Sequence, residues 1–368
     1  MEMELIRVLH VVTYMGRGGL ETMLMNYYRH IDRTRLQFDF LVHRDFEADY
    51  DSEILALGGR IYHLPVLNPF SRSYRKALDD FFKAHKEYKI VHSHLDCMAG
   101  IPLAAAKKNG VPVRIAHAHN SSQARDLKYP LKLLFKRNIP RSATELFACS
   151  REAGMWMFGS CEFQILNNAI DAAQYRPNHE VRKQKRRELG IAEDAFVVGH
   201  VGRFAPQKNH DFLLDVFAEL CGRSSEAFLL LVGDGELMPR MQKKATALGI
   251  EDKICFTGVR ADVAQLLQAM DVFCFPSLFE GLPVSIIEAQ VAGLPCLISE
   301  RVPSECIKTS IVRIADLESG AGQWADRLLT CRESCRSDTL ADIQAAGFDV
   351  RTNVNRLTDY YIRQYRSN

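Results

Sequence analysis

Two glutamates, Glu280 and Glu288, lie eight positions apart in the segment FEGLPVSIIEAQVAGLPC (279–296). Glu280 precedes a helix-like stretch, where backbone N–H groups have no partner within the helix and can bind an anion. Glu288 falls on the apolar face of that stretch, beside Val284 and Val291, and a carboxylate in such a place must be paired or bound to a ligand. The spacing therefore indicates a binding site; two purely structural glutamates are the alternative.

Two cations occupy the loop GRFAPQKN (202–209), which follows an apolar strand-like run and precedes a helix. Arg203 can grip a phosphate through two parallel hydrogen bonds, and Lys208 adds a point charge. Together with the free amides of a helix start, the pair predicts a polyphosphate site. Two solvated loop charges are the alternative.

A glycine-rich turn, YMGRGGLE (14–21), follows the first strand-like run. Gly16, Gly18 and Gly19 would let the backbone approach a ligand and would expose helix-start amides. The turn is not GxGxxG, and no acidic residue is placed as a dinucleotide fingerprint requires. A plain tight turn without a ligand is the alternative.

Short apolar strands alternate with helices twice over along the chain, which predicts two α/β domains, each with a parallel sheet covered on both faces. Ligands bind beyond the carboxyl ends of parallel strands, so the site is expected in the cleft between two doubly wound, Rossmann-like domains. The strand-like runs are 7–12, 38–42, 61–64, 90–94, 113–119, 146–150 and 164–166 in the first half, then 196–202, 228–235, 254–259, 272–277 and 295–299.

The expected domain limits are 1–175 for the first domain and 176–345 for the second, followed by a C-terminal region, 346–368. The polar, basic segment 176–189 is interpreted as a linker leading into the first helix of the second domain. A final helix is expected over 352–366, and the sequence leaves open whether it packs back on the first domain.

The composition indicates a protein of the cytoplasm. Net charge is +2, so no nucleic-acid partner is expected, and the opening MEMELIRVLH lacks the basic and apolar regions of a signal peptide. No apolar run reaches the ~18 residues needed to span a bilayer. The ten cysteines are scattered without a CxxC pair, which favours reduced thiols over disulfides or a zinc site.

The combined motifs GRFAPQKN, DGE, FTGV and FPSLFEGLPVSIIEAQVAGLPC resemble the retaining GT-B glycosyltransferases of the large family four, which includes enzymes of capsule, exopolysaccharide and lipopolysaccharide synthesis. The resemblance is dense from about 196 to 300 and extends more loosely through GGLE, AHAHN, ACS and NNAID. It rests on the E-x7-E spacing together with R-x4-K, because either motif alone is not specific.

The resemblance implies a role for each matching residue. Arg203 and Lys208 would hold the donor diphosphate, Glu280 would bond donor-sugar hydroxyls, and Glu288 would bind the nucleotide ribose. His119 would lie close to the donor sugar, so that the expected catalytic set is Glu280, Arg203, Lys208 and His119. The other expected donor-binding residues are Gly16, Gly18, Gly19, Val259, Arg260, Gly281 and Leu282.

Two departures from the family pattern affect individual assignments. NNAID (167–171) stands where the family has Pro-Asn-Gly-Val-Asp, which makes Asn168 a less certain contact. His117 and His119 both fall in AHAHN, and His119 is chosen because Asn120 follows it. A core histidine with a backbone partner is the alternative for either residue.

No metal and no cofactor are expected beyond the nucleotide diphosphate sugar that serves as co-substrate. DYD (49–51) matches the DxD of metal-dependent transferases, but it begins a helix-like stretch. Asp49 and Asp51 are therefore interpreted as N-terminal caps. Two basic side chains and helix amides would cover the diphosphate charge without magnesium.

A basic amphipathic segment, RDLKYPLKLLFKRNIPR (125–141), is typical of a membrane-surface anchor. Leu131, Leu134 and Phe135 recur at helical spacing within it. The prediction is a peripheral contact with the anionic inner face of the plasma membrane, where a lipid-linked acceptor would lie. A solvated face over an ordinary core contact is the alternative.

The expected activity is transfer of a sugar, with retention, from a nucleotide diphosphate sugar to a glycan or lipid-linked acceptor in cell-surface polysaccharide synthesis. UDP is the expected carrier because uridine is the commoner base in the family. The alternatives are a non-hydrolysing sugar-nucleotide epimerase of the same fold, an inactive partner subunit of another transferase, and a two-domain sugar-binding receptor. The sequence does not name the sugar, the acceptor, the linkage or the oligomeric state.

Overall fold

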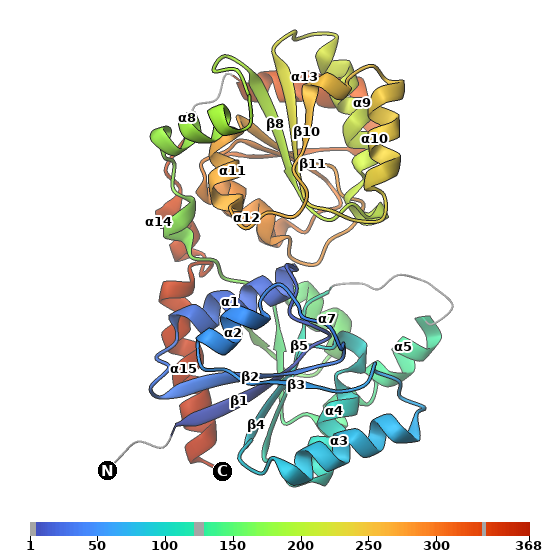
Figure 1. The fold of residues 1–368 in the computed structure, drawn as a ribbon, viewed down its shortest axis with the longest axis vertical. Helices are drawn as coiled ribbons and strands as arrows, with labels where there is room; N and C mark the ends of the chain where they lie inside the picture. Colours follow the sequence, from blue (N-terminus) through green and yellow to red (C-terminus); the bar gives the residue numbers. More distant parts are fainter. Residues whose placement is uncertain (1–4, 121–128, 333–335) are drawn as a thin grey trace. The chain divides into compact units, whose positions relative to one another are not determined.

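The chain folds into two compact α/β units in a computed structural model that describes residues 5–120, 129–332 and 336–368 (Figure 1). The first unit comprises residues 1–169 and 350–368, and the second comprises 170–349. The sequence analysis placed these two boundaries at 175/176 and 345/346, whereas the structure places them at 169/170 and 349/350.

The first unit is built on a seven-stranded parallel sheet in the order β3-β2-β1-β4-β5-β6-β7. The order reverses at β1 and β4, which makes their carboxyl ends the place where such a sheet binds ligands. The strands are β1 (Ile6–Val11), β2 (Leu36–Val42), β3 (Ile61–His63), β4 (Ile90–Ser93), β5 (Val113–Ala118), β6 (Glu145–Ala148) and β7 (Gln164–Ile165).

Helices cover this sheet because its strands carry buried side chains on both faces. The helix α15 (Val350–Arg366) returns to the first unit, where Val354, Leu357 and Tyr361 share a core with α1 (Gly19–His30) and the strands (Figure 1). The remaining helices are α2 (Asp51–Ala56), α3 (Arg72–Ala84), α4 (Gly100–Lys108), α5 (Tyr129–Lys136), α6 (Ile139–Ser142) and α7 (Arg151–Phe158).

The second unit repeats the plan with a six-stranded parallel sheet in the order β10-β9-β8-β11-β12-β13. Its order reverses at β8 and β11. The strands are β8 (Phe196–Val201), β9 (Ala227–Val232), β10 (Ile254–Phe256), β11 (Val272–Phe275), β12 (Cys296–Ser299) and β13 (Val312–Ala315). Among the described helices are α8 (His179–Glu188), α9 (His210–Cys221), α10 (Met238–Ala247), α11 (Val263–Ala269), α12 (Val284–Val291), α13 (Ala321–Arg332) and α14 (Leu340–Ala345).

The segment 176–189 is mostly helix, so its interpretation as a linker was wrong. Asn178 caps α8 by accepting from the Val181 N–H at 3.1 Å. Two basic side chains of the helix are folded onto the unit: Lys185 is buried and pairs with Asp262 at 2.7 Å, and Arg186 is buried and pairs with Asp271 at 2.7 Å. These ion pairs account for part of the charge of the segment, whereas Lys183 and Arg187 are exposed.

Candidate functional site

The loop after β8 presents the two predicted cations at the point where the strand order of the second sheet reverses. A 3-10 helix, Pro206–Lys208, carries Lys208, and Asn209 then turns into α9 with a left-handed φ of 55°. Arg203 is exposed, and its guanidinium makes no hydrogen bond or ion pair within the described chain. It is therefore available to an anionic ligand.

The carboxylate of Glu280 is held by this same loop. Lys208 donates from Nζ to Oε1 at 2.8 Å, and Gln207 donates from Nε2 to Oε2 at 3.0 Å. Gln207 also bonds the Phe279 carbonyl at 2.9 Å, which ties the loop after β8 to the loop after β11. Glu280 is buried, and its ion pair with Lys208 satisfies a charge that would otherwise be costly there.

Glu288 lies in the middle of α12, where the helix is buried almost all round and not on one apolar face. Its Oε1 accepts a hydrogen bond from the Tyr175 hydroxyl at 2.8 Å. Burial raises the pKa of Glu288 to about 7, although the hydrogen bond from Tyr175 opposes this shift. A carboxylate with one protein partner in such a place retains acceptor capacity for further hydroxyl groups.

The start of α12 supplies backbone amides beside Glu280. Gly281 and Leu282 lie between β11 and the helix, and neither N–H donates a hydrogen bond within the described chain. Pro283 is the residue before the first helical turn, where its missing N–H costs nothing. These amides are placed to bind an anion.

The loop after β10 holds two of the expected donor-binding residues, and it exposes Val259 but not Arg260. Val259 is 54% exposed. Arg260 is turned away into a fork with Asp262, at 2.7 Å from both carboxylate oxygens, and reaches Glu188 at 3.2 Å. Its guanidinium therefore stabilises the packing of the loop against α8.

The glycine turn of the first unit follows β1 and leads into α1, which Gly18 precedes as N-cap. None of Gly16, Gly18 and Gly19 has a left-handed φ. A Cβ on Gly18 would lie 2.3 Å from Glu21 Oε2, whereas a Cβ on Gly19 would meet no atom within 4 Å. A side chain at position 19 would therefore fit without a clash, so the chain itself does not require a glycine there. The space next to the helix start is open.

His119 follows β5 directly and is 8% exposed. Its Nε2 lies 2.9 Å from His94 Nδ1, while its own Nδ1 has no partner among the described residues. His117, two positions earlier, bonds His92 at 3.2 Å, deeper in the sheet. Both histidines are buried, which confirms the core position that the alternative gave them, but among the described residues neither ring bonds the main chain.

Asp49 and Asp51 do not approach each other as metal ligands; each bonds a backbone amide instead. Asp51 accepts from the Ala48 N–H at 2.9 Å and Asp49 from the Arg17 N–H at 3.2 Å. The helix α2 begins at Asp51, and its N-cap, Tyr50, makes no side-chain cap. The expectation of N-terminal caps was therefore right about the location and wrong about the bonds.

The basic segment 125–141 is described from residue 129 onward; residues 125–128 lie outside the described part. No residue of α5 is buried, and Leu134 is 58% exposed. Phe135 packs edge-on against the exposed Phe70 at 6.1 Å. Lys136, by contrast, donates to the Trp156 carbonyl and lies over the Trp156 ring at 4.3 Å.

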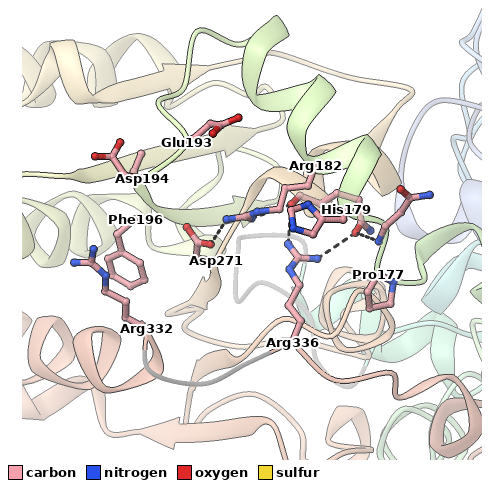
Figure 2. Close-up of a pocket in the computed structure, with 12 residues that line it drawn as sticks. Pro177, His179, Arg182, Glu193, Asp194, Phe196, Asp271, Arg332 and Arg336 are labelled. Carbon is pink, nitrogen blue, oxygen red and sulfur yellow. Dashed lines mark hydrogen bonds and ion pairs between the residues drawn. The ribbon is translucent and has the colours of Figure 1, made fainter.

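Figure 2 shows the residues that line a cavity of about 570 Å³ in the second unit. This cavity lies at the amino ends of β8 and β11, whereas Arg203 and Glu280 follow their carboxyl ends. It is lined by Phe196, which begins β8, and by Asp271, which precedes β11. Its arginines are already paired: Arg182 bonds Asp271 at 2.5 Å, and Arg336 bonds carbonyls at the end of α11. The cavity is therefore explained by the packing of α8 against α11.

Two residues of the site escaped the sequence analysis. Gln207 lies inside the quoted loop, but nothing in the sequence indicates that its amide reaches Glu280. Tyr175 lies more than a hundred positions from Glu288, and only the fold brings its hydroxyl to that carboxylate.

In the part of the chain that the structure describes, no helix is both long and apolar enough to pass through a bilayer.

Comparison with known protein families gives two matches along the chain. Residues 18–156 match the model described as "Glycosyl transferase 4-like domain", and residues 181–307 match "Glycosyl transferases group 1". The two matched segments contain Gly18, Gly19 and His119 in the first unit, and Arg203, Lys208, Glu280 and Glu288 in the second.

Two curated relatives align over most of the chain. EpsF of Bacillus subtilis (strain 168), which is named as a glycosyltransferase, is 36% identical over 375 residues, covering 96% of each protein. The Escherichia coli UDP-Gal:alpha-D-GlcNAc-diphosphoundecaprenol alpha-1,3-galactosyltransferase is 26% identical, covering 78% of this chain and 79% of the relative.

The fold is also found among solved structures. HepE of Anabaena, in complex with UDP-glucose, superposes with a TM-score of 0.81 at 20% identity, covering 97% of this chain and 99% of HepE. At this identity, the likeness shows that the two proteins share a fold.

Proposed function

Because this chain belongs to the GT-B glycosyltransferases of family four, we propose that it transfers a sugar from UDP-sugar, with retention, to a lipid-linked or glycan acceptor in polysaccharide synthesis. The observation that carries the proposal is the group formed by Arg203, Lys208 and Glu280 at the carboxyl ends of β8 and β11. The UDP-glucose bound to HepE and the name of the E. coli relative support the choice of carrier and acceptor class.

The reaction breaks the bond between the anomeric carbon and the diphosphate oxygen, and forms a bond from that carbon to the acceptor oxygen. Negative charge grows on the leaving diphosphate, and Arg203, Lys208 and the amides of Gly281 and Leu282 stabilise it. Lys208 has three N–H donors, so it can bond a phosphate while it keeps Glu280.

Glu280 serves as a ligand of sugar hydroxyls and not as a nucleophile in this mechanism. Both of its oxygens already accept from Lys208 and Gln207, which orients the carboxylate and lowers its tendency to attack carbon. The acceptor hydroxyl attacks on the face that the diphosphate leaves, and its proton passes to the leaving phosphate oxygen. The configuration at the anomeric carbon is then retained.

Glu288 holds the ribose in this proposal, through the acceptor capacity that Tyr175 leaves unused. Neither metal nor cofactor takes part, because the protein groups named above meet the diphosphate charge. The proposed place of action is the cytoplasmic side of the membrane, with α5 on the anionic surface.

A transfer assay on the purified chain, with a panel of nucleotide sugars, tests the proposal. A nucleotide sugar at 100 times its dissociation constant should stabilise the protein by ~2.7 kcal/mol, which selects donors for the assay. NMR of the product must show the anomeric configuration of the donor. Interconversion of the donor sugar without acceptor would favour the epimerase, and binding without turnover would favour an inactive subunit.

A further inference from the structure

Five histidines form a continuous polar stripe on one face of the otherwise apolar sheet of the first unit; we call them the histidine cluster. They are His10 on β1, His92 on β4 with His94 just beyond it, and His117 on β5 with His119 just beyond it. His10 and His92 are partners in the parallel register, and side chains alternate along strands, so all five rings project to the face that α15 covers.

Three of these rings form one hydrogen-bonded chain that ends at His119. His10 Nδ1 lies 3.0 Å from His94 Nε2, and His94 Nδ1 lies 2.9 Å from His119 Nε2. A second chain runs from the Tyr361 hydroxyl to His92, at 2.7 Å, and from His92 to His117, at 3.2 Å. His94 is the central link of the first chain because both of its nitrogens are bonded.

Every ring in the cluster is neutral at pH 7. Burial lowers the pKa of His10 and of His119 to about 3, and lowers the pKa of His92, His94 and His117 well below 6.5. A neutral imidazole has one N–H donor and one acceptor nitrogen. The first chain can therefore have only two polarities, and the tautomer of His94 decides between them.

With its proton on Nε2, His94 would donate to His10, and His10 would carry its own proton on Nε2. That N–H would be buried beside Phe38, whose ring centroid is 4.2 Å away, with no acceptor among the described residues. With its proton on Nδ1, His94 donates to His119, and His119 must carry its proton on Nδ1. The second polarity leaves only an unused acceptor at His10 and moves the free N–H to Nδ1 of His119, which is equally buried and has no acceptor among the described residues. His119 follows the carboxyl end of β5, where parallel sheets bind ligands, so a bound ligand is the acceptor that this polarity calls for.

The backbone of His119 is fixed as well as its ring. Asp96 accepts from the His119 N–H at 3.4 Å and from the Asn120 amide at 2.7 Å. Asp96 has a left-handed φ of 45°, a conformation that costs energy for a residue other than glycine and is found most often where function requires it. Ring and main chain are thus both held before any ligand binds.

We propose that His94, backed by His10, is a positioning residue that fixes His119 as an Nδ1–H donor to the sugar of the bound nucleotide sugar. The identity of the acceptor rests on the proposed function, and the choice of tautomer rests on a ligand being bound at this strand end. The N–H is suited to a sugar hydroxyl oxygen and is pre-oriented, so its hydrogen bond costs no reorganisation in the transition state.

The same rings could instead bind a divalent transition metal, because one nitrogen each of His94, His117 and His119 lie within 4.8 Å of one another. Neutral imidazoles are good ligands for zinc. Such an ion would take up the nitrogens that bond His94 to its neighbours, so metal binding and the hydrogen-bonded chain exclude each other.

The tautomers can be observed directly in the full chain labelled with 15N-histidine, without substrate, from two-bond 15N–1H couplings. The expected result is a proton on Nδ1 of both His94 and His119, unchanged by EDTA and by equimolar Zn²⁺. A proton on Nε2 of His119, or a spectrum that Zn²⁺ converts to a ligated form, overturns the proposal. Neither outcome depends on transferase activity.

Kinetics of two matched variants test the consequence for catalysis. His94→Phe keeps a ring in the core and removes the donor to His119, so kcat should fall by about ten-fold, the size of one lost hydrogen bond. The affinity for UDP, which lacks the sugar, should stay within about two-fold. His117→Phe, equally buried and outside the first chain, should change kcat by less than about two-fold.

Equal losses of kcat in His94→Phe and His117→Phe would indicate only a packing role and overturn the positioning role. If the wild-type protein turns over no donor, the proposed function is wrong. The NMR result would then still test the tautomer of His119.

Discussion

The Lys208 ammonium lies 2.8 Å from Oε1 of Glu280, and both side chains are shielded from water. The proposed diphosphate ligand and the proposed sugar ligand are thus joined before the donor arrives. The pair cancels charge that burial would make costly, and it means that a change at Glu280 also changes the field at Lys208.

Glu280→Gln should lower kcat more than it raises the donor KM, because the carboxylate matters most when the anomeric carbon becomes positive. It should not weaken the binding of free UDP, since Lys208 loses its counter-ion and keeps its charge for the phosphates. Glu288→Gln should weaken UDP and donor binding together, a uniform-binding effect. Calorimetry with UDP on both variants measures the difference; equal weakening would show that the two glutamates share one role.

Arg203→Ala and Lys208→Ala should each lower kcat by ~10²-fold or more, as the loss of a preorganised charge-stabilising group does. Arg240→Ala is the matched control, because the Arg240 side chain is 73% exposed in the same unit and pairs only weakly with Asp211. Steady-state kinetics with saturating acceptor measure the effect. Near-wild-type turnover in either site variant would remove that residue from the diphosphate site.

The alternation of apolar runs predicted twelve of the strands, because strands buried on both faces leave continuous apolar segments in the sequence. It missed β13 (Val312–Ala315), an edge strand in which Arg313 and Ile314 are exposed and no apolar run appears. It also misjudged α8, because a helix in which Lys185 and Arg186 are satisfied by distant carboxylates resembles a solvated linker in sequence.

Site residues close to a motif could be predicted, whereas partners brought in by the fold could not. Strand ends placed Arg203, Lys208 and Glu280, since the carboxyl ends of parallel strands meet at one edge of a sheet. The bonds from Gln207 and Tyr175 depend on loop conformation. The repeats HSH (92–94) and HAH (117–119) did carry a signal, because alternate histidines on two strands must share a face.

Glu288 should make the stability of the unliganded protein depend on pH. Burial raises its pKa from the ordinary 4.5 to about 7, so the folded state binds more protons than the unfolded state between these values. Stability contributed by this group is therefore present below pH 4.5 and is lost as pH rises through 7, by at most about 3 kcal/mol.

Glu288→Gln removes that loss, so the variant should be more stable relative to wild type at pH 8 than at pH 5. Thermal unfolding of both proteins without ligand, at the two pH values, measures the difference. If the difference in stability between Glu288→Gln and wild type is the same at pH 5 and at pH 8, Glu288 is ionised at both pH values. The ordinary exposed carboxylate variant Glu236→Gln provides the control.

Transfer activity should persist in EDTA, because Arg203, Lys208 and the amides of Gly281 and Leu282 meet the diphosphate charge. Activity is measured after dialysis against EDTA and again after Mg²⁺ or Zn²⁺ is restored. A full loss that Mg²⁺ reverses would reopen the question of a metal bound with the diphosphate. A loss that only Zn²⁺ reverses would point to the histidine cluster.

The exposed face of α5 should dock on anionic membrane, through an apolar side chain flanked by basic ones. Attraction to such a surface is ~1 kcal/mol per basic residue and is screened by salt. Lys136 is committed to Trp156, so the informative positions are Leu134 and Arg137, which are both exposed. Leu134→Gln and Arg137→Gln should each reduce co-sedimentation with vesicles rich in phosphatidylglycerol.

Leu55→Gln is the matched control, because Leu55 is 59% exposed in the same unit and lies on α2, away from the basic helix. Raising the salt from 0.1 M to about 1 M shortens the screening length from ~10 Å to ~3 Å, so it should weaken the sedimentation of the wild type without abolishing it and leave little difference between wild type and Arg137→Gln. The loss caused by Leu134→Gln should persist at both salt concentrations, because burial of an apolar side chain is not screened. If Leu55→Gln reduces sedimentation as much as Leu134→Gln does, the contact is not made by α5.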